Sequence, residues 1–402
     1  MTPPPSGGHP FPSQLRAWQA SLRSQFPIIT AHPDLVYLDS AATAQKPQAV
    51  LDAVHSYLAT SNANASRGAY PWANSTTADI ERTRARVQDF LGDPAPARSQ
   101  VHFVSGTSAG LRSVARDWLP GYLRNGDEII VPFGDHEANA APWLEAQELL
   151  ARQGTHITVH DMPYQRGSHD YDVVALAALV SPRTRFVATT HVHHVYGGDM
   201  NVHRVREVVG PDVVICLDAA QSAGHLPISL ADLDVDFVAF SGHKALALPG
   251  TGVIWARGRR GPAFAPSGWS GTPNTVGIIS LQAALDWLDS AGVGRIEQWT
   301  TALAARLTEG LRGLDRYDVL GCQLSLAQDS DVQQRKGIVT FRHQNIDAAD
   351  LGFILYSHGF MVRSDTHCQA RTGEARTSVR VSTHVYNTPE EVDRLVAVLA
   401  EL

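Results

Sequence analysis

The chain of 402 residues is long enough for two domains with a large hydrophobic core. Hydrophobic residues make up 44% and charged residues 18%, and the formal net charge is −7, which argues against a general nucleic-acid-binding protein. No stretch approaches the roughly 20 apolar residues that span a bilayer, so we expect no membrane partner. Three cysteines, Cys216, Cys322 and Cys368, are too few and too widely spaced for a disulfide framework or a metal site.

The first residues, MTPPPSGGHPFPSQ, are rich in proline and glycine and lack the basic and apolar segments of a signal peptide. We therefore expect residues 1–30 to form a partly disordered arm, and the protein to be cytoplasmic.

Short apolar runs alternate with amphipathic stretches over residues 31–287. Continuous Val, Ile and Phe runs are typical of strands buried on both faces, and helical patterns lie between them, for example over residues 75–92, with Ser75 as the N-cap, and over residues 202–210. This alternation predicts an α/β domain with a mainly parallel seven-stranded sheet, and ligands of such sheets bind beyond the carboxyl ends of the strands. The predicted strands are residues 100–105, 127–132, 156–160, 185–192, 212–219, 236–241 and 252–256.

The pattern changes after residue 287 and predicts a smaller α+β domain over residues 288–402, packed with the N-terminal segment. Two helical stretches, 277–292 and 294–314, lead into it. Its predicted strands are residues 337–343, 360–364 and 377–383, and its predicted helices are residues 347–359 and 388–402.

Two predicted strands end in residues whose side chains could take part in catalysis. The run DFVAFS ends in Ser241-Gly242-His243-Lys244, and VVICLDAAQ ends in Asp218, with Gln221 three residues later. A lysine is a useful covalent catalyst when it is partly desolvated, as at a strand end in a cleft. A lysine for a Schiff base and an acid for a pyridinium nitrogen are what a pyridoxal phosphate enzyme requires.

Several motifs resemble, in order, the class V, fold type I pyridoxal phosphate enzymes, and more narrowly the group II cysteine desulfurase/selenocysteine lyase family. The resemblance covers the chain from about Leu35 to the C-terminus. Its motifs are VYLDSAATAQKPQAV, NANASRG, FVSGTSAGL, GDHEANAAPW, CLDAAQSAGH, DFVAFSGHK, SGTPNT and YNTPEEVDRLV.

The resemblance implies that pyridoxal 5'-phosphate is the cofactor. Lys244 would carry the Schiff base, Asp218 would pair with the ring nitrogen, and His136 would stack on the ring and shuttle protons. Gln221 and His194 match positions that contact the phenolic oxygen. Phosphate contacts are implied for Thr107, Ser108, Ser241 and His243, and Thr272 would reach the phosphate of a neighbouring subunit, which implies a homodimer.

The small domain would supply the substrate-binding and sulfur-transfer groups. Arg380 matches the arginine that clamps the substrate α-carboxylate, with which a guanidinium makes two parallel hydrogen bonds. Arg363 and Arg67 are further expected substrate ligands. Cys368, five residues after Arg363, matches the cysteine that takes up the substrate sulfur as a persulfide. A sulfur-acceptor protein would then receive this sulfur from Cys368.

The chain departs from the family pattern at four places. Ser66 replaces a histidine before Arg67, and His193-His194 replaces Ser-Asn. The family's Gly-His-His-Cys is Asp365-Thr366-His367-Cys368 here. Residues 257–270 form a much shorter segment than in the family.

These features lead to a first hypothesis and two alternatives. The first is a desulfurase that converts L-cysteine to L-alanine with transfer of sulfur to Cys368. The second is a class V enzyme of changed chemistry: a C–S β-lyase, an amino-acid epimerase or an aminotransferase. The third is a sulfur-scaffold or regulatory protein with a degenerate site, which the lysine, aspartate and histidine argue against.

Overall fold

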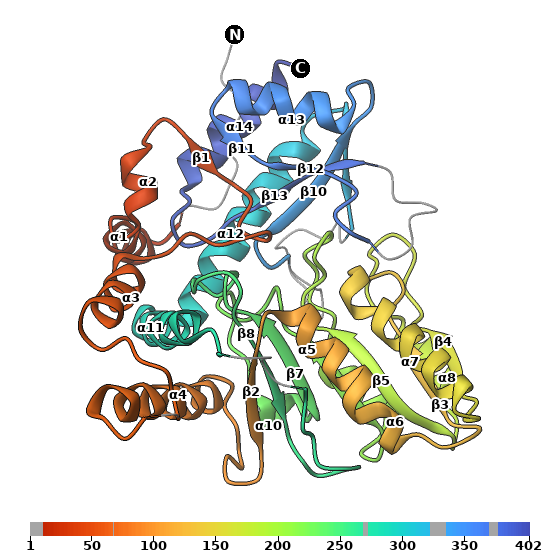
Figure 1. The fold of residues 1–402 in the computed structure, drawn as a ribbon. Helices are drawn as coiled ribbons and strands as arrows, with labels where there is room; N and C mark the ends of the chain where they lie inside the picture. The colour runs from red at the N-terminus through yellow and green to blue at the C-terminus, as the bar shows by residue number, and fades with distance from the viewer. Residues whose placement is uncertain (1–10, 67, 268–271, 322–334, 370–376) are drawn as a thin grey trace.

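The computed structural model describes residues 11–66, 68–267, 272–321, 335–369 and 377–402. A seven-stranded sheet forms the centre of the larger part of the molecule (Figure 1), with strand order β2-β8-β7-β6-β5-β3-β4. The contacts among β3 to β7 are parallel, and β8 is antiparallel to both of its neighbours. The strands are β2 (Gln100–Val104), β3 (Glu128–Val131), β4 (Thr158–Asp161), β5 (Thr184–Thr190), β6 (Val214–Asp218), β7 (Phe237–Ser241) and β8 (Gly252–Ala256).

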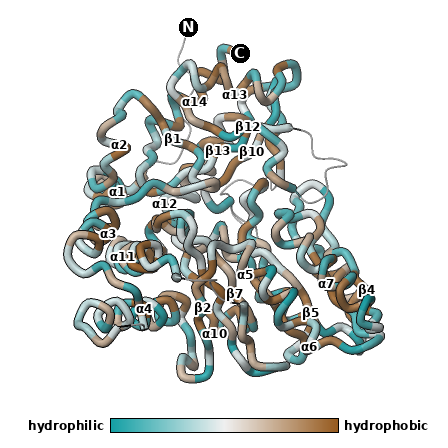
Figure 2. Tube along the Cα trace, viewed as in Figure 1, coloured by the Kyte–Doolittle hydropathy of each residue, from teal (hydrophilic) through white to brown (hydrophobic). Residues whose placement is uncertain are grey.

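All seven predicted strands are present, and the mainly parallel sheet is confirmed. Every residue of β3, β6, β7 and β8 is buried, as expected for runs without polar alternation. Hydrophobic segments gather on these strands in Figure 2.

Helices pack around this sheet and connect its strands. On one side α11 packs against α3 and α4 (Figure 1). The helical elements are α3 (Gln48–Thr60), α4 (Pro71–Phe90), α5 (Thr107–Ser113), a π-helical turn η1 (Val114–Trp118), α6 (Leu119–Tyr122), a 3₁₀ turn η2 (Glu137–Asn139), α7 (Ala141–Arg152), α8 (Val173–Leu179), α9 (Val202–Val209), α10 (Leu230–Leu233) and α11 (Thr275–Ala291).

The predicted start of the helix over residues 75–92 is wrong. The helix begins at Pro71, one turn before Ser75, and no side chain caps it. Proline fits the first helical position because its missing N–H has no partner there. The end is as predicted, since Gly92 follows the helix with φ of 60°.

The C-terminal part is built around a second sheet with strand order β12-β13-β10-β9. The predicted strand 360–364 is two short strands, and the first of them pairs with β1 near the N-terminus. The strands are β1 (Val36–Tyr37), β9 (Tyr317–Leu320), β10 (Ile338–His343), β11 (Phe360–Met361), β12 (Arg363–Asp365) and β13 (Ser378–Ser382), and the helices are α12 (Val293–Arg312), α13 (Ala348–Ser357) and α14 (Pro389–Ala400).

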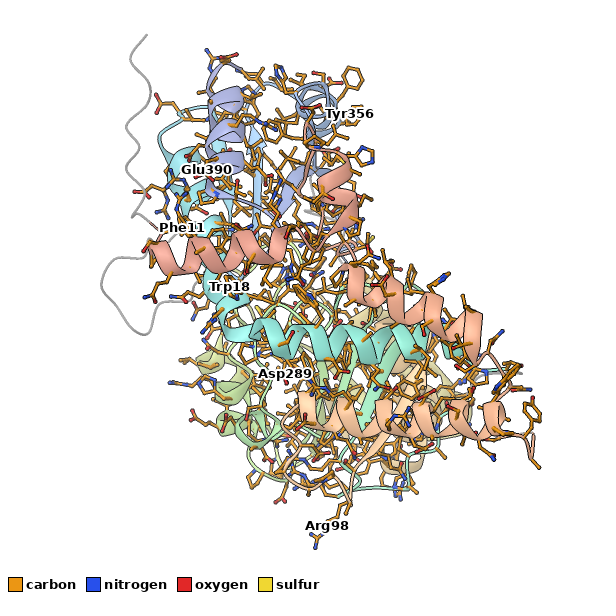
Figure 3. All side chains as sticks on the ribbon, turned by 90° about the vertical axis from the view of Figure 1, so that its left-hand side faces the viewer. Phe11, Trp18, Arg98, Asp289, Tyr356 and Glu390 are labelled. Carbon is orange, nitrogen blue, oxygen red and sulfur yellow. The ribbon has the colours of Figure 1, made fainter. Side chains whose placement is uncertain are left out.

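The N-terminal helices α1 (Ser13–Arg23) and α2 (Pro27–Ala31) join the two parts. Phe11 and Leu15 belong to the hydrophobic core of the C-terminal part, while Trp18 Nε1 donates a 3.0 Å hydrogen bond to the carbonyl of Ala291. Arg16 pairs with Glu390 at 2.6 Å. Figure 3 shows α1 between α11 and α14, with Phe11, Trp18 and Glu390 labelled.

Across the described ranges, no helix combines the length and the apolar character needed to cross a membrane.

Gly252 is where the sheet and α5 come closest together. A Cβ atom on Gly252 would lie 2.6 Å from Gly106 Cα and 2.7 Å from the Phe240 carbonyl oxygen, and both contacts are with backbone. We predict that Gly252→Ala lowers the free energy of unfolding by about 1–3 kcal/mol, because the backbone before α5 must shift. Urea denaturation measures this change.

Gly294→Ala is the matched control. Gly294 is exposed near the start of α12, and its added Cβ would meet only Pro227 Cγ, at 3.8 Å. This variant is expected to be neutral or stabilised by up to about 1 kcal/mol. Equal stabilities of the two variants would contradict the close approach at Gly252.

Candidate active site

The loops that follow β2, β3, β6 and β7 meet at one edge of the large sheet, on the side that faces the second sheet (Figure 1). β6 ends at Asp218, and β7 ends at Ser241 and leads within three residues to Lys244. β2 leads to Thr107 at the start of α5, and β3 leads to His136 before η2. The topology therefore brings the predicted residues to one edge, where ligands of such sheets bind.

Lys244 and Asp218 come from neighbouring strands, because Asp218 pairs in register with Ala239 of β7. Burial lowers the pKa of Lys244 to about 8, and the charge of Asp218 opposes this shift. Burial raises the pKa of Asp218, although a 2.9 Å hydrogen bond from Ala220 N and the charge of Lys244 draw it back down. A lysine with a lowered pKa presents a useful fraction of neutral, nucleophilic amine near neutral pH.

Thr107 and Ser241 join the start of α5 to the end of β7. Ser241 Oγ accepts a 2.8 Å hydrogen bond from Thr107 N and lies 2.7 Å from Thr107 Oγ1. Ser108 follows with an exposed side chain, and no side chain caps the helix. Hydroxyl groups and helix N–H groups together suit an anion such as a phosphate.

Two histidines stand next to each other above this edge. The rings of His136 and His194 meet edge to face, with centroids 5.0 Å apart. His136 Nδ1 accepts a 3.1 Å hydrogen bond from Ala138 N, which assigns the ring proton to Nε2. Burial, helped by the charge of Lys244, lowers the pKa of His136 to about 4, so the ring is neutral at pH 7.

Asp135 forms a buried hydrogen-bonded group beneath His136. Its carboxylate accepts hydrogen bonds from Tyr164 Oη at 2.8 Å and Tyr171 Oη at 2.7 Å, and His193 Nε2 lies 3.6 Å away. Burial raises the pKa of Asp135 to about 7. These contacts fix the backbone from which His136 projects.

Gln221 and His243 are fastened to the N-terminal segment that precedes α3. Gln221 Nε2 donates a 3.0 Å hydrogen bond to the Ala41 carbonyl. The His243 carbonyl accepts from Thr43 Oγ1 at 3.3 Å and from Lys46 Nζ at 3.4 Å. Burial lowers the pKa of Lys46 to about 8. The segment thus holds the turn that carries Lys244.

Arg380 reaches the site from β13 of the second sheet. Its guanidinium is buried, donating to the His194 carbonyl at 3.0 Å and to Asp39 Oδ1 at 3.1 Å. Within the described ranges its Nε has no hydrogen-bond partner. The arginine therefore keeps a donor available at the junction of the two sheets.

Cys368 lies in a turn between β12 and β13, and its side chain is exposed. Its sulfur is 3.4 Å from Arg363 Nη2, and its carbonyl accepts a 3.0 Å hydrogen bond from Glu137 N. The next residue, Gln369, forms a β-bridge with His136. The thiol-bearing turn is therefore attached to the same segment that carries His136.

Of the remaining residues named from the sequence, the structure describes Thr272 and Cys216. Thr272 is exposed, two residues before Asn274, which caps α11. Arg67 and Cys322 lie outside the described residues, and Cys216 is a fully buried thiol in β6.

Sequence reasoning missed the supporting carboxylates. Asp39, Asp135 and Asp365 each hold a neighbouring functional group, and none was assigned a role. Asp365 had a readable signal, because it lies two residues after Arg363 and directly follows a predicted strand, and continuing that strand by one residue puts both side chains on the same face. Asp39 had none, since its partner Arg380 is 341 residues away.

Comparisons with known proteins identify the family of the chain. The family model described as aminotransferase class V matches residues 36–395. A cysteine desulfurase of Cronobacter sakazakii is 32% identical, with 95% of this chain and 97% of the relative covered. A cysteine desulfurase of Klebsiella pneumoniae is 34% identical at the same coverage.

Solved structures give the same result. The apo structure of a cysteine desulfurase from Thermococcus onnurineus NA1 matches with a TM-score of 0.83 and 26% identity, over 95% of this chain and 97% of that one. A cysteine desulfurase of Escherichia coli, in its S-sulfonic acid form, matches with a TM-score of 0.79 and 29% identity, over 95% and 98%. The fold is therefore that of the fold type I pyridoxal phosphate enzymes, and the chain belongs to the class V aminotransferase family, alongside its cysteine desulfurases.

Proposed function

We propose that this protein is a pyridoxal phosphate-dependent cysteine desulfurase or selenocysteine lyase that converts L-cysteine to L-alanine and receives the sulfur on Cys368. The observation that carries the proposal is the attachment of the exposed Cys368 turn beside His136, at the sheet edge that holds Lys244 and Asp218. The desulfurase names of relatives at about 30% identity support it.

The residues at this edge fit pyridoxal phosphate, the cofactor on which the family depends. His194 Nε2 and Arg380 Nε are buried polar atoms without a hydrogen-bond partner among the described residues, which is costly unless a ligand satisfies them. Asp218 is a buried carboxylate near a buried lysine, as a protonated ring nitrogen requires. When bound, the cofactor supplies an electron sink for negative charge at the substrate α-carbon.

We assign the cofactor contacts residue by residue. Lys244 would form the covalent link, Asp218 would hold the ring nitrogen, and His136 would lie over the ring. Gln221 and His194 would face the phenolic oxygen. The phosphate would lie against Thr107, Ser108, Ser241 and His243, with Thr272 of a second subunit completing the contacts in a homodimer.

The protein's own groups orient the substrate and move protons. Arg380 would take the α-carboxylate with its available donor, and Arg67 remains a proposed ligand. Lys244, with a pKa lowered by burial to about 8, can accept the α-proton once its amine is free. His136 is neutral and carries its proton on Nε2, so it can donate a hydrogen bond toward the reacting centre.

The sulfur transfer balances with Cys368 as the acceptor. The Cys368 thiolate attacks the substrate sulfur and forms an S–S bond as the carbon–sulfur bond breaks. The bonding electron pair stays with the substrate, whose β-carbon takes up a proton to give alanine. The enzyme keeps a persulfide, and because Cys368 is exposed, a sulfur-acceptor protein can collect it.

The same proposal covers the organisation of the chain. We propose an arm over residues 1–30, a cofactor-binding domain over 31–287 and a small domain over 288–402, in a cytoplasmic protein. The packing of Phe11 and Leu15 into the core of the C-terminal part supports the association of the arm with the small domain.

Replacing Cys368 tests the sulfur chemistry. With L-cysteine and a reductant, the wild-type protein is expected to release equal amounts of alanine and sulfide without pyruvate. Cys368→Ser should lower this turnover by at least about 100-fold, because a hydroxyl does not replace a thiolate as nucleophile. Cys216→Ser is the control, since that thiol is buried in β6 and should not change the products.

Alanine, sulfide and pyruvate are measured together in this experiment. If the protein releases pyruvate with sulfide, and Cys368→Ser does so as well, the reaction is β-elimination and the proposed desulfuration is wrong. A wild-type protein that binds no pyridoxal phosphate would overturn the enzyme assignment altogether.

The lowered pKa of Lys244 predicts how cofactor loading depends on pH. Only the neutral amine condenses with the aldehyde, and its fraction grows as pH rises through about 8. Loading of apoprotein, followed by absorbance, should therefore speed up about tenfold between pH 7 and pH 9 and then level off.

Asp218→Asn tests whether the pKa of Lys244 determines the pH dependence of cofactor loading. Removing the carboxylate removes the charge that raises the pKa of Lys244, so the midpoint of the loading profile should move to lower pH. A midpoint near the ordinary lysine value in the wild-type protein would show that Lys244 is not buried as described.

A further inference from the structure

The turn that carries Cys368 has an unusual backbone. His367 and Cys368 are consecutive non-glycine residues with φ of 57° and 58°, in the left-handed region. Side chains other than glycine rarely adopt this conformation, and it persists where surrounding contacts fix it. The contacts that fix this turn therefore determine where the thiol points.

Asp365 makes the central contacts of the turn. Its Oδ1 accepts a 2.6 Å hydrogen bond from His367 N, which closes the turn over Thr366, the one residue between them. The same carboxylate accepts from Arg363 Nε at 2.9 Å and lies 2.8 Å from Arg363 Nη2. Two residues apart on β12, the two side chains project from one face of the strand.

Arg363 connects the Asp365 carboxylate to the thiol of Cys368. Its Nη2 also donates toward Cys368 Sγ at 3.4 Å. The guanidinium thus lies between a carboxylate and a sulfur, and it points its charge at the group expected to ionise. Burial alone would raise the pKa of Asp365, but the contacts with Arg363 hold this pKa below its ordinary value. The carboxylate is therefore charged.

The rest of the turn is held from two sides. His367 Nε2 lies 2.9 Å from Ser378 Oγ of β13, within hydrogen-bond distance. His367 Nδ1 lies 2.9 Å from Asp365 Oδ1. This contact is not an ion pair, because burial, followed by the charge of Arg380, lowers the pKa of His367 and leaves the ring neutral. Gln369 Nε2 donates to Tyr196 Oη at 3.3 Å.

We propose that Asp365 is a positioning residue that fixes the Arg363 guanidinium against Cys368, so that the arginine stabilises the thiolate and the persulfide formed from it. This assigns Arg363 to the sulfur acceptor instead of the substrate carboxylate, which Arg380 takes. The role rests on the proposed function in that Cys368 is the acceptor. Asp365 is a feature of this chain, because the resembling family has glycine at that place.

The direction in which removal of the Asp365 charge shifts the ionisation of the Cys368 thiol distinguishes two possible roles of this carboxylate. As an isolated negative charge, Asp365 would disfavour a nearby thiolate, whereas as the anchor of Arg363 it favours one. Removing its charge therefore shifts thiol ionisation in opposite directions under the two roles. The charged and titratable groups around the turn in the described part of the chain are Arg363 and Asp365 on β12, Arg380 on β13, Asp39 after β1, His136 and Glu137 at η2, His367 within the turn, and Lys244 after β7.

The test is the pH dependence of alkylation of Cys368 by iodoacetamide in the holoenzyme. A Cys322→Ser background removes one competing thiol, and the buried Cys216 should not react. In Asp365→Asn the midpoint of the profile should move upward by about 0.5 to 1 pH unit, and the rate at pH 7 should fall about 3- to 10-fold. An unchanged or lower midpoint overturns the proposal.

Two further variants complete the experiment. Arg363→Gln should move the midpoint upward as well. The midpoint of the double variant should lie at or below that of Arg363→Gln alone, because without the arginine Asp365 acts only as a negative charge that disfavours the thiolate. Additive shifts would overturn the proposal. Asp350→Asn, an exposed carboxylate on α13, is the matched control and should leave the profile unchanged.

The profile is read without turnover, so the two proposals can fail separately. A protein that alkylates as expected but releases no alanine from cysteine keeps the positioning role and loses the proposed function. A protein that desulfurates cysteine with no upward shift in Asp365→Asn keeps the function and loses the positioning role.

Discussion

The arrangement of Lys244 and Asp218 on adjacent strands is the constraint on which the rest of the site depends. A buried ammonium and a buried carboxylate are each costly by themselves, and each moderates the pKa of the other. Register places Asp218 beside Ala239, and the three residues after Ser241 bring the lysine back over the sheet edge. The hydrophobic core of β6 and β7 thus supports a buried pair of polar groups at the edge of the sheet.

Much of the fold could be predicted because burial leaves a clear pattern. Four of the seven strands of the large sheet, β3, β6, β7 and β8, are short runs buried along their whole length, and all seven were found. The short strands were harder to predict: β1 was expected only from the family resemblance, β9 was missed, and residues 360–364 form two strands with different partners. A two-residue strand such as Val36–Tyr37 is too short to show a periodic pattern of hydrophobic residues. It forms because it pairs with a strand more than 300 residues away in the chain.

The site could be predicted only as far as its motifs extend. Lys244, Asp218, His136 and Arg380 follow from strand ends and from a family resemblance. The residues that orient them do not, because Asp39, Asp135 and Asp365 act through contacts that depend on the folded backbone. The place of Asp365 in the chain indicates a departure from the family, yet only the geometry shows that this carboxylate holds the arginine and closes the turn.

The hydrogen bond from Glu137 N to the Cys368 carbonyl has a consequence for how sulfur leaves the protein. It fastens the thiol-bearing turn to the large sheet, while β12 and β13 fasten it to the small one. A cysteine anchored from both sides cannot act as a swinging arm that carries its cargo away. For the proposed sulfur transfer, the acceptor would therefore have to approach Cys368 in its fixed turn.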